Sequence, residues 1–213
     1  MYRAILFDND GILVDTERYY FQANRMVMRE HGLDLSAEQY FQFFLKENRG
    51  MWHLMEARGF APDNITRLRS SRNEHYASLL ASEDISIPGA ESVLAALAAR
   101  FKIGVVTSSR RDHFSIIHER TGFAKYFDFV IAEGDYALSK PDPDPYRVAV
   151  QRSGFSAQEC LAIEDSPRGL QAAKAANLAC WVIPSELTRS GNFSTADRVL
   201  SSIGELPGWL LNS

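Results

Sequence analysis

The chain has 213 residues and a formal net charge of -4, and 46% of its residues are hydrophobic and 23% charged. This is typical of a globular protein with one domain, or with a core domain and a smaller insertion. The negative charge argues against a nucleic-acid-binding surface. Apolar runs such as residues 93–99 are far shorter than the roughly 20 residues that span a bilayer, and the first residues lack a signal-peptide pattern. We expect a cytoplasmic protein without nucleic-acid or membrane partners, either a monomer or a weak homodimer.

The first predicted strand, residues 2–7, is followed by a long stretch without a convincing strand. Thr16 can cap a helix that ends at Gly32. Further helices are expected at 36–46, 48–58 and 62–82, and residues 83–91 form a linker with the turn signal Pro88-Gly89. The sequence therefore predicts a helical cap domain at 16–86, inserted into a core of residues 1–15 and 87–213.

From residue 88 onward, short apolar runs alternate with segments of helical periodicity. Strands are expected at 102–107, 128–131, 160–164, 179–183 and, more weakly, 197–200. Helices are expected at 89–99, 112–121, 143–153 and 167–177. Asp144 and Ser166 can cap the last two. Continuous apolar runs are typical of parallel strands covered on both faces. The pattern predicts an α/β fold with a doubly wound, Rossmann-like parallel sheet.

Polar side chains lie where four of the predicted strands end or in the loops that follow. They are Asp8 and Asp10, Thr107, Ser108 and Ser109, Lys140, and Glu164 and Asp165. Because ligands bind beyond the carboxyl ends of strands in open α/β sheets, we expect these groups to converge. Crowded carboxylates cannot all stay ionised unaided, and a hard cation resolves their repulsion. Oxygen ligands without a nearby His or Cys favour Mg²⁺ over Zn²⁺.

A cation, a lysine, hydroxyls and backbone amides together describe a site for phosphoryl transfer. One carboxylate can be the nucleophile and form an aspartyl-phosphate, while a second gives a proton to the leaving alcohol and then takes one from water. Asp8 and Asp10 lie two residues apart and suit these roles. Gly11 lets the chain turn sharply after them. Asn9 is expected to point away from the site, and Asp15 to act at a hinge.

Four segments in order resemble motifs of the haloacid dehalogenase superfamily of phosphotransferases. They are "FDNDGILVDTE", "VVTSS", Lys140 in "KPDPDPY", and "EDSPRGLQAAKAAN". The resemblance covers nearly all of the chain, and the ordered set is far more specific than Asp-x-Asp alone. The helical insertion resembles the small cap of the β-phosphoglucomutase-like subfamily, which opens and closes over the core.

The resemblance implies that Asp8 is the nucleophile and Asp10 the acid/base. The implied phosphate-binding groups are Thr107, Ser108 and Lys140. The implied Mg²⁺ ligands are Asp8, the backbone carbonyl of Asp10, and Asp165, with Glu164 as a further ligand or an outer support. True haloacid dehalogenases lack the second Asp of the first motif, so Asp10 disfavours dehalogenation.

Two departures from β-phosphoglucomutases bear on the reaction. Those enzymes carry a His four residues after the first motif's Thr, where this chain has Tyr20, a poor base near neutral pH. Their cap loop Lys-Gly-x-x-Arg aligns with residues 49–53, so Arg49 replaces the Lys and His53 the Arg. We expect a Mg²⁺-dependent phosphatase acting on a small phosphorylated metabolite such as a sugar phosphate, with a phosphomutase as the alternative.

Substrate specificity is expected to depend on the cap. Candidate substrate contacts are Arg49, Tyr20, Ser109, Arg110 and Arg111. The arginines of the helix at 62–82, namely Arg67, Arg69 and Arg72, are expected on a solvated face. His113 and His118 show no metal-ligand spacing, and Cys160 and Cys180 are expected to be small buried side chains rather than a disulfide.

A non-enzymatic alternative is a phospho-Asp signalling domain. Receiver domains also gather an Asp, an acidic pair, a Thr and a Lys around Mg²⁺. In those domains the acidic pair precedes the phosphorylated Asp, whereas here Glu164 and Asp165 follow Asp8, and the helical cap has no counterpart.

Overall fold

The structure, a computed structural model, describes residues 1–212. Within these residues one parallel sheet has the strand order β3-β2-β1-β4-β5-β6. The strands are β1 (Ala4–Phe7), β2 (Lys102–Val106), β3 (Phe129–Ile131), β4 (Cys160–Glu164), β5 (Ala179–Val182) and β6 (Arg198–Val199). Strand order reverses between β1 and β4, where ligands bind in such sheets. The predicted α/β fold is confirmed.

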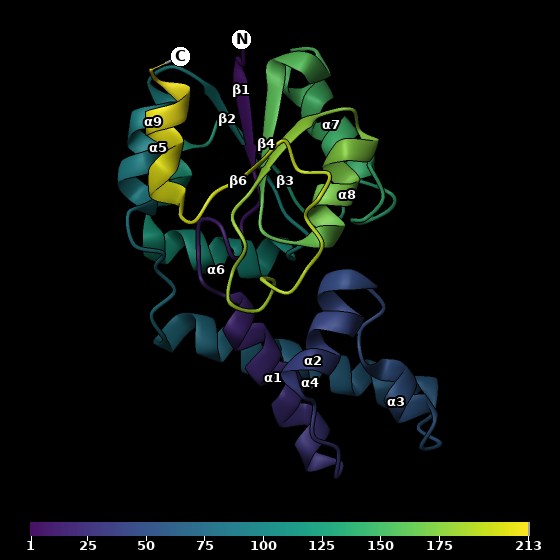
Figure 1. The fold of residues 1–213 in the computed structure, drawn as a ribbon. Helices are drawn as coiled ribbons and strands as arrows, with labels where there is room; N and C mark the ends of the chain where they lie inside the picture. Colours follow the sequence, from purple (N-terminus) through teal and green to yellow (C-terminus); the bar gives the residue numbers. More distant parts are fainter. Residues whose placement is uncertain (213) are drawn as a thin grey trace.

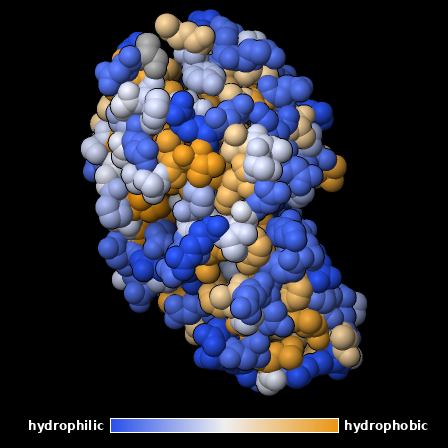
Figure 2. Space-filling view, in the orientation of Figure 1, coloured by the Kyte–Doolittle hydropathy of each residue, from blue (hydrophilic) through white to orange (hydrophobic). Residues whose placement is uncertain are grey.

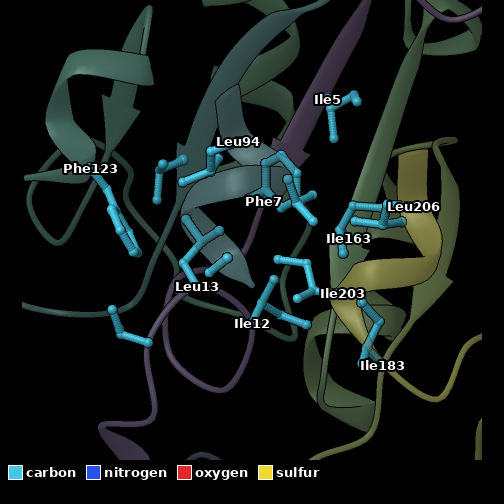
Figure 3. Close-up of a cluster of buried hydrophobic side chains, with 14 of the residues drawn as sticks. Ile5, Phe7, Ile12, Leu13, Leu94, Phe123, Ile163, Ile183, Ile203 and Leu206 are labelled. Carbon is cyan, nitrogen blue, oxygen red and sulfur yellow. The ribbon is translucent and has the colours of Figure 1, made fainter. Parts of the chain in front are cut away.

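Helices cover both faces of the sheet (Figure 1). They are α5 (Ala90–Ala98), α6 (Arg111–Thr121), η2 (Phe123–Tyr126), α7 (Asp144–Ser153), η3 (Ala157–Glu159), α8 (Pro167–Ala175), η4 (Ile203–Glu205) and α9 (Leu206–Leu210). Because successive strand residues point to opposite faces, the sheet builds two cores. Ile5, Phe7 and Ile163 pack with residues of α5 and α9 on one face (Figure 3). Leu6 and Ala162 pack with residues of α7 and α8 on the other.

A second group of helices lies beyond the carboxyl ends of the strands, and we call it the cap (Figure 1). It comprises α1 (Glu17–Glu30), α2 (Ala37–Tyr40), the π-helical η1 (Phe41–Lys46), α3 (Trp52–Glu56) and α4 (Pro62–Ser82). The cap has a core of its own, which includes Met28, Tyr40, Met51, Trp52 and Ile65. Figure 2 shows a mostly hydrophilic visible surface that narrows where the cap meets the rest of the chain. The exact division at residues 16 and 86 stays a prediction.

The chain leaves and re-enters the sheet region at neighbouring residues. The Asp15 N–H donates a hydrogen bond to the Ile85 carbonyl at 3.0 Å. Val14 forms an antiparallel bridge with Ser86. The segment that carries the first motif is therefore tied directly to the segment that returns from the cap.

Local structure differs from the prediction at two helix starts. The helix expected from residue 48 begins at Trp52, because Asn48 and Gly50 have positive φ values of 52° and 69°, a conformation foreign to right-handed helices. Asp144 does not cap α7 but is its first residue. Its carboxylate instead accepts a hydrogen bond from the Ala137 N–H at 2.7 Å.

Other local expectations are confirmed. Ser166 caps α8 by accepting a hydrogen bond from the Gly169 N–H at 3.2 Å. Cys160 and Cys180 are buried free thiols within the described chain. No helix of residues 1–212 is both long and apolar enough to cross a membrane.

Candidate active site

Lys140 lies at the centre of a buried charge cluster at the carboxyl ends of the middle strands. Its Nζ donates hydrogen bonds to Asp8 Oδ1, Glu164 Oε1 and the Val106 carbonyl, each at 2.7 Å. Burial lowers the pKa of Lys140, but the carboxylates of Asp8 and Glu164 outweigh it and leave this pKa above its ordinary value. Lys140 therefore stays charged and holds Asp8 in one orientation.

The carboxylates around Lys140 destabilise one another. Burial raises the pKa of Asp8, and the Lys140 ammonium opposes this rise. Burial and the neighbouring Asp8 carboxylate raise the pKa of Asp165 as well. Among the described residues, one oxygen each from Asp8, Glu164 and Asp165 lies within 4.8 Å of the others. This all-oxygen donor set fits Mg²⁺, whose charge would relieve their repulsion.

Glu164 has additional partners besides Lys140. Its Oε1 accepts a hydrogen bond from the Tyr146 hydroxyl at 2.6 Å, and its Oε2 accepts one from Ser166 Oγ at 3.4 Å. Asp165 has a single hydroxyl partner, Ser185 Oγ, at 3.2 Å. Asp165 is therefore the better placed of the two to offer oxygens to a metal.

Glycines make room for both of these carboxylates. Gly11 has a φ of 85°, and a Cβ there would lie 2.6 Å from Asp165 Oδ2. A Cβ at Gly169 would overlap the Glu164 carboxylate. A side chain at either position would displace an acidic group of the cluster.

Asp10 is surrounded by hydroxyl groups rather than by charges. Its carboxylate accepts hydrogen bonds from Thr16 Oγ1, from Ser109 Oγ at 2.8 Å and from Thr107 Oγ1 at 3.2 Å. Thr107 Oγ1 also accepts the Ser109 N–H at 2.9 Å, so this hydroxyl supports Asp10 and its own loop. The buried Ser108 hydroxyl has no partner among the described residues. Ser108 is thus the hydroxyl of this loop that remains available to a ligand.

Asn9 points away from the site, as predicted. It is fully buried, and its Oδ1 lies 2.9 Å from His118 Nε2 on α6. Burial lowers the pKa of His118 to about 4, so the ring is neutral near pH 7. The Asn9 carbonyl accepts the N–H groups of Leu13 and Val14. Asn9 therefore fixes the loop from which Asp8 and Asp10 project.

A cavity of about 440 Å³ lies between the sheet and the cap, a size suited to a small metabolite. Its core wall consists of Asp8, Asp10, Ser108, Ser109, Arg110, His113, Glu133, Lys140, Asp165, Ser166 and Arg168. Its cap wall consists of Glu17, Tyr20, Phe44, Leu45, Asn48, Thr66, Arg69, Ser70, Arg72, Asn73 and Tyr76. The structure thus brings Asp8, Asp10, Ser108, Lys140 and Asp165 together in the lining of a single cavity, whereas the predicted site residues Thr107 and Glu164 are fully buried and lie outside that lining.

The predicted substrate contacts divide into two groups. Those that line the cavity are Tyr20, Ser109 and Arg110. Arg49 lies outside its lining, pairs with Glu47 at 2.6 Å and covers the Phe43 ring. Arg111 also lies outside and pairs with Asp135. The positive φ of Asn48 turns the loop so that Arg49 leaves the cavity.

The prediction that Arg72 lies on a solvated face was wrong. Arg72 is 8% exposed and lines the cavity, because the polar face of α4 is turned toward the site. Glu17 and Arg168 also line the cavity and were not predicted to do so, although both lie within the quoted sequence motifs. Asn48 bridges the cap to the core by hydrogen bonds with Arg168 at 2.7 Å and Ser139 at 3.0 Å.

The fold and this site define a class of protein. The sequence pattern of haloacid dehalogenase-like hydrolases matches residues 2–177, and the chain belongs to this family. The putative phosphatase YhcW of Bacillus subtilis (strain 168) is 32% identical over 209 residues, which cover 97% of this chain and 94% of that protein.

Two solved structures share the whole architecture. CbbY from Rhodobacter sphaeroides, a mutant in complex with xylulose-(1,5)bisphosphate, superposes with a TM-score of 0.83 at 30% identity, covering 97% of this chain and 96% of that one. β-Phosphoglucomutase from Clostridium difficile superposes with a TM-score of 0.81 at 25% identity, covering 100% and 96%. The predicted resemblance is confirmed: the protein is a haloacid dehalogenase-like phosphatase of the β-phosphoglucomutase-like subfamily. Membership of a hydrolase family leaves the signalling alternative without support.

Proposed function

We propose that this protein is a Mg²⁺-dependent phosphatase that hydrolyses a small sugar phosphate or similar metabolite through a phosphoryl group carried by Asp8. The observation that supports this most directly is the placement of Lys140 Nζ, 2.7 Å from both Asp8 Oδ1 and Glu164 Oε1, with Lys140 and Asp8 in the cavity lining. The sugar bisphosphate bound to CbbY supports a phosphorylated sugar as the substrate class.

The residues divide the chemistry into two steps. First, an Asp8 oxygen attacks phosphorus, the bond from phosphorus to the alcohol oxygen breaks, and protonated Asp10 gives its proton to that oxygen. Next, water attacks the phosphorus of the aspartyl-phosphate while Asp10 accepts the proton. This releases inorganic phosphate and restores the Asp8 carboxylate. The hydroxyls of Thr16 and Ser109 keep Asp10 in place for both steps.

The charged groups around Asp8 have separate tasks in this proposal. Asp8, Asp165 and the Asp10 carbonyl would hold Mg²⁺, while Glu164 orients Lys140. When bound, Mg²⁺ supplies positive charge to the phosphoryl oxygens. Lys140 and the Ser108 hydroxyl would bind the same oxygens and offset charge in the transition state.

Tyr20 favours hydrolysis over phosphomutase chemistry. Burial raises the pKa of Tyr20, so its hydroxyl is a poor base near neutral pH, and this hydroxyl accepts a hydrogen bond from Arg72 at 2.5 Å. A phosphomutase would build up a sugar bisphosphate intermediate from a sugar monophosphate. We expect release of inorganic phosphate without that intermediate.

The nucleophile assignment is tested by Asp8→Asn. The amide keeps the size of the side chain but is a poor nucleophile, so we expect kcat for phosphate release from p-nitrophenyl phosphate to fall by about 10⁴-fold or more. Circular dichroism should show an unchanged fold, and EDTA should abolish turnover of the wild type. Asp63→Asn is the control, because Asp63 is exposed in the first turn of α4 and lies outside the cavity lining. Activity retained by Asp8→Asn would overturn the assignment.

A further inference from the structure

Arg72 of α4 is a buried cation without a carboxylate partner among the described residues. It is 8% exposed. Its guanidinium donates instead to neutral acceptors, the Tyr20 hydroxyl at 2.5 Å, Asn73 Oδ1 at 2.9 Å and Asn24 Oδ1 at 3.2 Å. Buried charges in proteins are normally paired, because an unpaired one loses its hydration without compensation.

The position of Arg72 is fixed although its charge is not neutralised. The guanidinium lies 4.6 Å from the centre of the Tyr20 ring and 5.7 Å from that of Trp52. Within residues 1–212, the hydrogen bonds of Arg72 come from Nε and Nη1 only. Nη2 therefore has no hydrogen-bond partner among the described residues, and Arg72 is one of the residues that line the cavity.

Arg72 belongs to a cationic part of the cap wall. Thr66, Arg69, Ser70 and Asn73 line the cavity at helical spacings of three and four, so they share one side of α4. Arg69 lies 5.3 Å over the Trp52 ring and, in the described chain, has no ion pair. The acid of this wall, Glu17, accepts a hydrogen bond from the Tyr40 hydroxyl instead. Both arginines are thus left for a ligand.

The reacting phosphate has no need of these arginines, since it would be bound at the core wall by Lys140 and Ser108. Arg49, the cap cation favoured by the sequence, already pairs with Glu47 outside the cavity. We propose that the substrate carries a second anionic group, a phosphate or a carboxylate, remote from the reacting phosphate, and that Arg72 with Arg69 binds it. Guanidinium groups suit both anions because they donate two parallel hydrogen bonds. This inference rests on the proposed phosphatase function.

Matched substrate pairs test the proposal. One pair is fructose 6-phosphate and fructose 1,6-bisphosphate, and the other is glycerol 3-phosphate and 3-phosphoglycerate, so that the pairs separate a second phosphate from a carboxylate. We expect kcat/KM of the wild type to favour the doubly anionic member of at least one pair by about 100-fold, the scale of a buried charged contact. Arg72→Gln should reduce this preference to about tenfold or less, and Arg72→Lys should restore part of it.

The control is Arg67→Gln, since Arg67 lies on α4 but outside the cavity lining, and its preference should match the wild type. The proposal would be overturned if Arg72→Gln lowered kcat/KM equally for both members of a pair. It would also be overturned if the kcat/KM of the wild type showed no preference in either pair.

Calorimetric titration of Asp8→Asn separates this inference from the proposed function. The affinity of Asp8→Asn for the doubly anionic compound should exceed its affinity for the partner with one anionic group by about tenfold or more. The double variant Asp8→Asn/Arg72→Gln should bind the two compounds equally. If no compound is hydrolysed by the wild type, the proposed function fails while this titration still decides the anion site. Equal binding of both partners in Asp8→Asn rejects the anion site.

Discussion

The two walls of the cavity treat charge in opposite ways. On the core wall the ammonium of Lys140 is surrounded by its acceptors, and the carboxylate of Asp10 is held by hydroxyls. On the cap wall Arg72 is held by neutral groups, and its charge is left unpaired within the described chain. The chemical step benefits from groups positioned before the substrate arrives. Substrate recognition can instead rely on an unpaired charge, which is neutralised only when a ligand of opposite charge binds.

The largest effect is expected on the core wall, from Lys140→Met. This change keeps the length of the side chain but leaves the buried carboxylates of Asp8 and Glu164 facing each other without a cation. We expect the free energy of unfolding to fall by about 3–5 kcal/mol, measured by urea denaturation. The value of kcat should fall by about 10³-fold. The double variant Lys140→Met/Glu164→Gln should regain stability but not activity, and a single variant as stable as the wild type would contradict the prearranged core wall.

A smaller effect is expected from Gly169→Ala in α8, which would disturb the Glu164 carboxylate that contacts Lys140. The added methyl group would overlap the Glu164 carboxylate and push it away from Lys140. We expect a loss of about 1–3 kcal/mol in the free energy of unfolding, together with reduced kcat. Gly208→Ala is the matched control, because a Cβ there meets no atom within 4 Å. Equal melting temperatures for the two variants would show that Glu164 can move freely.

The smallest effect is expected on the cap wall, from Tyr20→Phe. The hydroxyl that orients Arg72 is lost, while the aromatic ring beside the guanidinium remains. We expect the preference for doubly anionic substrates to fall by about fivefold, the scale of one typical hydrogen bond of about 1 kcal/mol. Stability should change little. Tyr126→Phe removes a hydroxyl bound to the distant Glu91 and should leave the preference unchanged.

The core wall could be predicted from the sequence because topology dictates where its residues lie. Asp8 directly follows β1 and Asp165 directly follows β4, so once the apolar runs are recognised as parallel strands, both must emerge at the same edge. The direction of the Asn9 side chain could be predicted in the same way, because its neighbours Asp8 and Asp10 point into the site. Its partner His118 could not be foreseen, because that contact depends on how α6 packs beneath the loop.

The cap wall could not be predicted to the same depth. A helix face turned toward a polar cavity has the same composition as one turned toward water, so Arg69 and Arg72 were assigned to a solvated face. Helical periodicity also missed the loop before α3. The backbone turn at Asn48 and Gly50 there directs Arg49 out of the cavity. Tertiary packing, rather than local pattern, decides these positions.

The hydrogen bond between Asp15 and Ile85 has a consequence for how such a protein can change over generations. Since the chain leaves the core and returns to it at adjacent residues, the whole cap is encoded by one continuous stretch of the gene. A helical segment with the same end-to-end span could be spliced in without moving the strands that carry the reactive groups. New substrates can then be acquired by exchanging one stretch of coding sequence, while the chemistry is inherited intact.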